Sequence, residues 1–215
     1  MNKINYQKEL DKLIENFNKE GQVPSLLLHS CCGPCSSYCI EYLSQYFNVT
    51  VFYYNPNIYP DDEYYHRVKE QQRFINQFPT KHPVAFIEGD YDKDRFYEIA
   101  KGLENEPEKG ARCHKCYDLR LRRTGMVAQE KSFDFFTTTL TISPMKDSQV
   151  LNEIGMKIAN ELKIHWLPSD FKKREGYKRS TELSKEYDMY RQDYCGCVYS
   201  YRDRQLQKQQ ASMED

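Results

Sequence analysis

Apolar positions along the chain follow two spacings, one typical of strands and the other of helices. Short runs of β-branched and aromatic residues predict strands over residues 25–30, 49–54, 84–87, 133–140 and 164–168. Stretches in which apolar residues recur every three or four positions predict helices over 5–20, 34–47, 61–78, 92–101, 113–131, 147–162 and 179–194. Turn-forming residues such as Gly33, Asn55-Pro56-Asn57 and Ser143-Pro144 separate these segments.

The alternation of strand and helix predicts the fold class. Parallel strands need crossover connections, and these usually place helices on both faces of the sheet. We therefore expect an α/β protein, a single Rossmann-like (HUP-like) domain with a mostly parallel sheet and helices on both faces. Its expected parts are an N-terminal helix within 1–24, a core over 25–199 and a charged, Gln-rich tail over 200–215 that frays.

Composition places the chain among globular proteins. Of its 215 residues 39% are hydrophobic and 14% aromatic, and the mean hydropathy is −0.86, so a sizeable core lies beneath a very polar surface. No stretch is apolar enough for a signal peptide or a membrane span, and we expect a cytoplasmic protein with no membrane partner. The chain has eight cysteines. In a reducing compartment, clustered cysteines indicate metal binding or redox chemistry rather than structural disulfides.

The first strand leads directly into a cysteine-rich turn, His29-Ser30-Cys31-Cys32-Gly33-Pro34-Cys35. Pro34 suits the first position of the following helix, because the N–H that proline lacks would have no partner there. Free N–H groups in a first helical turn favour negative charge, so we expect them to lower the pKa values of the nearby thiols. Ligands of open parallel sheets bind beyond the carboxyl ends of the strands, where Cys31 and Cys32 lie.

Two further cysteine groups follow other element ends, Cys113-x-x-Cys116 and Cys195-Gly196-Cys197. A structural zinc ion takes four ligands and leaves three of these seven thiols unused, and a thioredoxin-like dithiol explains only one pair. An iron–sulfur cluster takes four thiolates and leaves three for a second metal or for chemistry, so we favour an iron–sulfur site. The eighth cysteine, Cys39, lies one helical turn beyond Cys35, and we expect it in the core.

Other candidate residues have a structural interpretation beside the functional one. His29 ends the first strand and His114 lies between two cysteines, so each is either a candidate ligand or a structural histidine, while Lys146 is an anion contact or a solvated lysine. Candidates for stacking on nucleic-acid bases, or for the core, are Tyr53, Tyr54, Tyr59, Tyr64 and Tyr65. The first turn has no Gly-rich loop of the kind that holds nucleotide phosphates.

The net charge of −1 conceals two basic runs. Residues 111–123 hold five Lys or Arg and one Asp, and residues 171–179 hold five Lys or Arg and one Glu, so each run carries a net charge of +4. Such runs are typical either of a solvated face or of a phosphate-binding rim. On the second interpretation, the side chains that contact phosphates include Arg120, Arg122, Lys172 and Lys173.

Taken together, the motifs resemble the QueH family of epoxyqueuosine reductases. The resemblance covers roughly residues 25–200 and rests on five motifs in order. They are His-Ser-Cys-Cys-Gly-Pro-Cys at 29–35, Tyr-Asn-Pro-Asn-Ile-Tyr-Pro at 54–60, Cys-His-Lys-Cys-Tyr at 113–117, Thr-Thr-Leu-x-Ile-Ser-Pro at 138–144 and Arg-Gln-x-Tyr-Cys-Gly-Cys at 191–197. Any one of these motifs alone is weak, whereas their order is specific.

The resemblance implies a single catalytic domain over residues 1–215 that reduces the epoxide of epoxyqueuosine to queuosine without cobalamin. The substrate lies at the wobble position of the tRNA anticodon, and the reaction is the last step of queuosine biosynthesis. The resemblance also implies a 4Fe-4S cluster, a second metal ion that is iron, tRNA as partner and an external electron donor. The metal ligands that it implies are Cys31, Cys32, Cys35, Cys113, Cys116, Cys195 and Cys197.

We expect these seven ligands to divide into two groups. The cluster-binding group is Cys32, Cys113, Cys116 and Cys197, and the catalytic group on the second metal is Cys31, Cys35 and Cys195. An interchange of Cys31 with Cys32, or of Cys195 with Cys197, fits the same spacing. The alternatives to a reductase are another iron–sulfur tRNA enzyme of the thiolation type, which would need a nucleotide loop, and a zinc-bound RNA-binding module.

Overall fold

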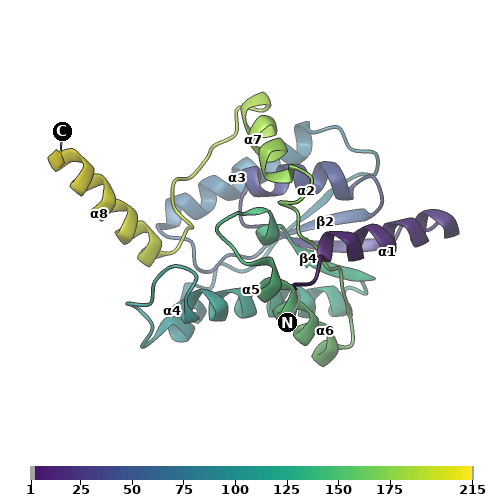
Figure 1. Ribbon diagram of the computed structural model, residues 1–215, viewed down its shortest axis with the longest axis horizontal. Helices are drawn as coiled ribbons and strands as arrows, with labels where there is room; N and C mark the ends of the chain where they lie inside the picture. The colour runs from purple at the N-terminus through teal and green to yellow at the C-terminus, as the bar shows by residue number, and fades with distance from the viewer. Residues whose placement is uncertain (1–2, 215) are drawn as a thin grey trace.

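A central parallel sheet organises the molecule, which we describe from a computed structural model over residues 3–214 (Figure 1). Within that range the sheet has five strands in the order β3-β2-β1-β4-β5, all paired in parallel. The strands are β1 (Ser25–His29), β2 (Asn48–Tyr53), β3 (Ala85–Glu88), β4 (Phe135–Thr138) and β5 (His165–Trp166). The predicted α/β fold is confirmed, and β1 lies at the centre of the sheet.

Helices cover both faces of this sheet. They are α1 (Tyr6–Glu20), α2 (Gly33–Leu43), α3 (Asp61–Gln77), α4 (Lys93–Ala100), α5 (Ala111–Glu130), the 3₁₀ helix η1 (Thr139–Ile142), α6 (Ser148–Leu162), α7 (Gly176–Glu186) and α8 (Val198–Glu214). In Figure 1, α2 and α3 lie above the sheet and α5 and α6 below it, while α8 points away from the other elements. No helix within residues 3–214 combines the length and the apolar character that crossing a membrane requires.

Alternate residues of β1 pack into the two layers. Leu26 and Leu28 join the core on the side of α1 and α2, whereas Leu27 packs with Leu121 of α5 and Ile158 of α6. Burying one such leucine contributes roughly 1.5–3 kcal/mol. Both layers therefore stabilise β1 and fix the position of the cysteine-rich turn that follows it.

Two segments after β5 differ from the prediction. The predicted helix over 179–194 is too long, because α7 ends at Glu186. Asp188 adopts a positive φ of 46° and Met189 turns into the core, so the chain is irregular from there to Cys197. The tail that was predicted to fray is helical instead, as α8, and Asp193 pairs with Lys208 of this helix at 2.7 Å.

Candidate metal centre

The first cysteine group lies at the carboxyl end of β1. The Sγ atoms of Cys31, Cys32 and Cys35 all lie within 4.8 Å of one another, and those of Cys31 and Cys32 are 3.8 Å apart. Cys32 precedes α2 in an extended conformation, and Pro34 occupies the first turn of the helix as predicted. A Cβ at Gly33 would lie 2.7 Å from Cε of Met189, so a side chain there would displace the end of this methionine. One short turn thus gathers three soft ligands suited to a metal.

The pKa values of these three thiols differ. Hydrogen bonds from Cys32 and Cys35 lower the pKa of Cys31 well below its ordinary value, and the same interactions raise the pKa of Cys35. The sequence predicted lowered pKa values from the helix N–H groups, but only Cys31 shows one, and neighbouring thiols are its main cause. Cys31 is therefore the first of the three to become a thiolate, the form that binds metals.

The second cysteine group comes from two segments far apart in the sequence. Cys113 and Cys116 lie in the first turns of α5, and Cys195 and Cys197 lie in the irregular segment before α8. Burial raises the pKa values of Cys113 and Cys116, and charge on Cys195 and Cys197 raises them further. Among the described residues, no three of these four thiols bring their Sγ atoms within 4.8 Å of one another. The structure thus places them near one another but less tightly than the first group.

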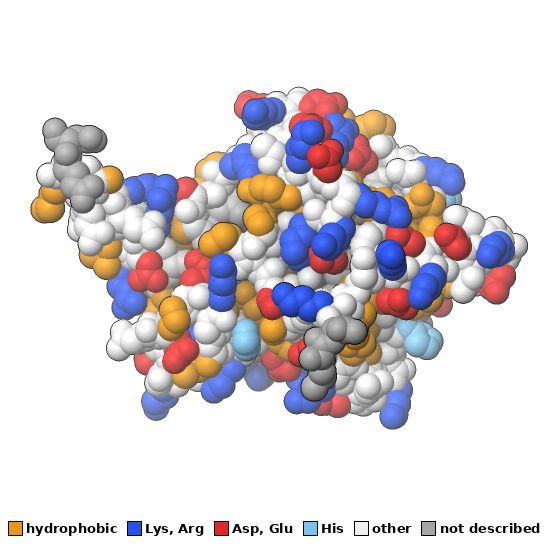
Figure 2. Space-filling view, in the orientation of Figure 1, with side chains coloured by type: hydrophobic (Ala, Val, Ile, Leu, Met, Phe, Trp, Pro, Cys, Tyr) orange, Lys and Arg blue, Asp and Glu red, His pale blue; other side chains and the backbone are white. Residues whose placement is uncertain are grey.

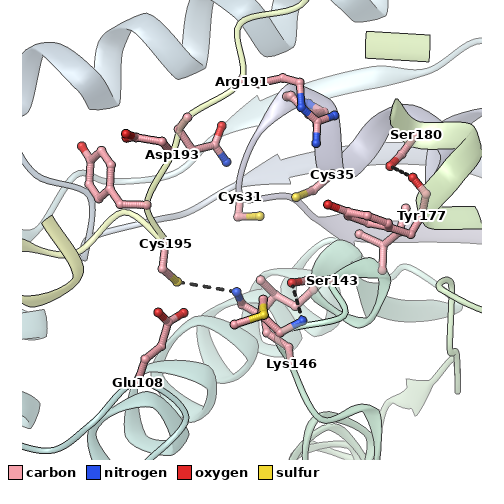
Figure 3. Close-up of a pocket in the computed structure, with 16 residues that line it drawn as sticks. Cys31, Cys35, Glu108, Ser143, Lys146, Tyr177, Ser180, Arg191, Asp193 and Cys195 are labelled. Carbon is pink, nitrogen blue, oxygen red and sulfur yellow. Dashed lines mark hydrogen bonds between the residues drawn. The ribbon is translucent and has the colours of Figure 1, made fainter. Parts of the chain in front are cut away.

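A cavity of about 390 Å³ opens beside the two groups (Figure 3). Cys31, Cys35 and Cys195 line it, and the other four candidate ligands do not. Lys146 is partly buried in the cavity wall, and its Nζ donates a hydrogen bond to Sγ of Cys195 at 3.5 Å. Burial opposes the charge of Lys146, but Coulomb interactions with neighbouring groups, Cys195 first among them, outweigh burial and raise its pKa. Lys146 is therefore not a fully solvated lysine, since its Nζ contacts a cysteine sulfur.

Two buried arginines flank the cysteines. Arg120 is 3% exposed, and its Nη1 donates to Oδ1 of Asn55 at 3.3 Å. Arg67 is 1% exposed and forms an ion pair with Glu63 at 2.7 Å. Burial disfavours both charges, yet the neighbouring sulfurs, Cys116 beside Arg120 and Cys32 beside Arg67, raise the pKa of each guanidinium. Both arginines are therefore cationic, and they would offset the negative charge of thiolates that bind a metal.

Several buried polar atoms near Cys32 lack a hydrogen-bond partner among the described residues. They include Nη2 of Arg67, Nε2 of Gln71 and Oε1 of Gln192. The Nε2 of Gln192 donates to Sγ of Cys32 at 3.1 Å. Unused N–H donors beside thiols fit an iron–sulfur cluster, because hydrogen bonds to its sulfurs are part of how a protein tunes it. The donor set of soft thiolates and the spare donors therefore suit this type of group.

Cys39 and the two candidate histidines lie outside the metal group. Cys39 is fully buried in the core of the α2 face, as predicted. His29 is also fully buried, with Nδ1 2.9 Å from Oγ1 of Thr138 and Nε2 3.2 Å from the carbonyl oxygen of Tyr54. Burial, with the charge of Arg120, lowers the pKa of His29 to about 3, so this histidine is neutral and structural. His114 is exposed on α5.

The basic runs are not continuous rims of exposed, unpaired cations, since several of their side chains are buried or paired. Arg112 and Arg120 are buried, and Arg122 holds a carboxylate partner at 2.6 Å. In the second run, Lys172 and Arg179 also hold carboxylate partners at 2.6 Å. The net charge of a run does not show which of its side chains face inward, and here several of them do.

The candidate stacking tyrosines divide between core and surface. Tyr53, Tyr54 and Tyr64 are buried, as the core interpretation predicts. Tyr59 and Tyr65 are 37% and 52% exposed, but neither lines the cysteine cavity. These tyrosines therefore do not identify a base-binding surface at the site.

Sequence reasoning missed Arg67, Gln71 and Gln192. Arg67 and Gln71 fall on the face of α3 that also buries Tyr64 and Phe74, and a polar residue at such a position was the signal that could have found them. Gln192 lies in an irregular segment, where periodicity gives no indication of what a side chain contacts.

The fold and the site together define an α/β protein with a thiol-rich centre beyond the carboxyl ends of a parallel sheet. Comparison with known proteins identifies the family. The family model described as epoxyqueuosine reductase QueH matches residues 26–203, and the chain belongs to this family. It is therefore an oxidoreductase, which the chemistry of its thiol-lined cavity suits.

Relatives named epoxyqueuosine reductase QueH resemble the chain over most of its length. The protein of Staphylococcus epidermidis is 45% identical over 202 residues, which cover 92% of this chain and 85% of the relative. That of Streptococcus pyogenes serotype M1 is 46% identical over 200 residues, 92% of this chain and 78% of the relative. That of Thermotoga maritima is 32% identical over 186 residues, 84% of this chain and 92% of the relative.

Proposed function

We propose that this chain reduces the epoxide of epoxyqueuosine at the wobble position of tRNA, which gives queuosine and completes the biosynthesis of that nucleoside. One observation carries the proposal beyond the family assignment. The cavity beside the first cysteine turn exposes three candidate ligands, while Cys32, Cys116 and Cys197 are buried behind them. A buried set of cysteines suits electron storage, and a set of cysteines exposed in the cavity suits contact with a substrate.

The division of the ligands that we propose agrees with this burial for six of the seven cysteines, while Cys113 is half-buried and does not line the cavity. Cys32, Cys113, Cys116 and Cys197 would hold a 4Fe-4S cluster, and the catalytic group of Cys31, Cys35 and Cys195, which lines the cavity, would hold a second metal ion, iron. When bound, the cluster supplies single electrons and the second metal supplies a Lewis acid. Because the Sγ atoms of Cys31 and Cys32 are only 3.8 Å apart, their exchange between the two groups remains an alternative assignment.

Other residues of the cavity contact the substrate or carry a positive charge beside the thiolates. Removal of an epoxide oxygen as water consumes two electrons and two protons, so an external electron donor is required. Lys146 keeps a proton on Nζ beside Cys195 and offsets the negative charge of the thiolates. Tyr177 and Met145 line the cavity with 43% and 52% of their surface exposed. They offer apolar surface against which an unstacked base of an RNA loop can pack.

Anaerobic single-turnover reduction tests the proposal. The protein is loaded with iron and sulfide and mixed with dithionite and an anticodon stem-loop that contains epoxyqueuosine, and the nucleosides are then identified by mass spectrometry. We expect queuosine to appear in proportion to the iron–sulfur content. Iron-loaded protein that leaves the epoxide intact would refute the reductase. Incorporation of sulfur into the RNA would instead indicate a thiolation enzyme, and protein that holds only zinc would indicate an RNA-binding module.

A further inference from the structure

A second cavity, of about 570 Å³, lies alongside the cysteine cavity, and Met145 and Lys146 line both. Its walls come from the segment before α1, the loop before α5, the loop from η1 to α6 and the segment between β5 and α7. We call it the basic cleft, after the lysines that line it: Lys3, Lys109, Lys146, Lys172 and Lys173. The two basic runs of the sequence contribute only the last two of these side chains.

The charge of the basic cleft is strongly positive. Five lysines face two aspartates, a net charge of +3 in a chain whose overall charge is −1. Both aspartates are already engaged, since Asp170 accepts from Lys172 at 2.6 Å and Asp147 accepts from the backbone N–H of Gln149 at 2.8 Å. Figure 2 shows Lys and Arg side chains gathered in the middle of this face, between α7 and the N-terminal segment.

Three lysines of the cleft are free to contact an anion. Lys3, Lys109 and Lys173 are exposed, and no carboxylate lies within ion-pair distance of any of them among the residues that the structure describes. By contrast, Lys146 donates to Cys195 and Lys172 to Asp170. Free exposed lysines around a concave surface are typical of sites that hold phosphate oxygens.

The cysteine cavity next to the cleft has a different character. Its lining contains Lys146 and Arg191 as well as Glu108 and Asp193, so the formal charges of these four side chains cancel. With Tyr177 exposed in its lining, this cavity suits a base or nucleoside, whereas the basic cleft suits a charged backbone. Met145 and Lys146 line both cavities, so the two cavities lie side by side, as neighbouring parts of one ligand would require.

We propose that the basic cleft binds the phosphodiester backbone of the RNA loop whose modified nucleotide enters the cysteine cavity. This inference rests on the proposed function for the identity of the RNA, but its geometry does not depend on the reaction. Lysines neutralise phosphates and release counterions, so binding at the cleft weakens as the salt concentration rises. The contacts position the loop, while the cysteine cavity receives the base.

Binding of an anticodon stem-loop to the holoprotein tests the cleft. The variant Lys109→Glu/Lys173→Glu reverses two of the three free charges, and Lys69→Glu/Lys157→Glu makes the same change at exposed lysines of α3 and α6 that line neither cavity. We expect the cleft variant to lose at least tenfold in affinity, while the control variant binds like the wild type. The slope of log affinity against log salt should flatten by about 1.4, since each single-strand phosphate contact contributes about 0.7.

The possible outcomes of this experiment test the cleft and the proposed reaction separately. If wild-type protein fails to reduce the epoxide but the cleft variant alone loses RNA affinity, the cleft stands and the proposed reaction is refuted. If the cleft variant binds RNA like the control, the inference is wrong, whatever the activity of the wild type. If it binds RNA normally but loses reduction only with a protein electron donor and not with dithionite, the lysines dock an acidic protein instead. Displacement of the RNA by inorganic phosphate at constant ionic strength would likewise overturn the inference, in favour of a small-anion site.

Discussion

The two cysteine groups are built in different ways. Cys31, Cys32 and Cys35 come from one turn whose position the central strand fixes, and their Sγ atoms lie within 4.8 Å of one another. The group of Cys113, Cys116, Cys195 and Cys197 forms only when α5 and the segment after α7 approach each other. Local backbone geometry thus sets the first group, and tertiary packing sets the second.

The segment that carries Cys195 and Cys197 depends on contacts with α3 and its surroundings. The carbonyl of Gly196 accepts a hydrogen bond from the N–H of Tyr59 at 2.8 Å, and a Cβ at Gly196 would lie 3.3 Å from Nη1 of Arg67. Gly196 also has a φ of +128°, a conformation that side-chain-bearing residues rarely adopt. We therefore expect the second group to be lost more easily than the first.

The largest expected effects distinguish the two groups of cysteines that we propose by function, the cluster-binding group and the catalytic group. Cys113→Ala removes a proposed cluster ligand, so we expect it to lose both the brown colour and the activity. Cys35→Ala should keep most of the colour yet abolish epoxide reduction, because its side chain lines the cavity and not the buried set. Iron, sulfide and visible absorption, with single-turnover reduction under dithionite, are measured for each variant.

Cys32→Ala sharpens this test, since Cys32 is close to Cys35 in space but assigned with Cys113. It should behave like Cys113→Ala. If Cys32→Ala and Cys35→Ala behave alike, the turn holds one metal as a unit and the proposed division is wrong. Near-wild-type reduction by Cys35→Ala would show that the exposed thiols take no part in the chemistry.

A smaller effect is expected from Arg67→Gln, which leaves Glu63 without its cationic partner but keeps the hydrogen bond from Tyr190. Breaking a buried ion pair costs roughly 3–5 kcal/mol, and we expect about 3 kcal/mol because Glu63 is 12% exposed. Loss of the spare donor beside Cys32 should also speed the release of iron on anaerobic chelation. Denaturant unfolding and the rate of iron release are the measurements. Arg67→Lys, which keeps the charge, is the matched control, and equal iron release from both variants and the wild type would contradict a role in holding the group.

The smallest effect is expected at Cys39. Cys39→Ala removes one buried sulfur and should cost about 1 kcal/mol of unfolding free energy, as a small truncation in a core does. Metal content and activity should stay close to wild type, since its Sγ lies outside the group of Cys31, Cys32 and Cys35. A drop in bound iron, measured in the purified variant, would place Cys39 in the metal site after all.

The parts of the structure that the sequence predicted are those set by local signals. The strand before the first cysteine turn, Pro34 in the first turn of α2 and the alternation that produces the parallel sheet all follow from spacing and backbone preference. The burial of Arg120 did not follow, because a charged residue is expected outside unless a partner inside is known. The end of α7 was mispredicted for a similar reason. Met189, which lies beyond the end of the helix, packs against Gly33, and this contact joins distant parts of the chain.

That contact between Met189 and Gly33 has a consequence for the order in which the protein is made. The sheet and the first cysteine turn lie in earlier parts of the chain, while the segment that carries Cys195 and Cys197 packs onto that turn through Met189. A nascent chain therefore exposes Cys31 and Cys35 well before it possesses its last two thiols. If all seven proposed ligands bind metal, then metal delivered during translation would meet an incomplete set, and loading of the full centre would wait until synthesis has passed residue 197.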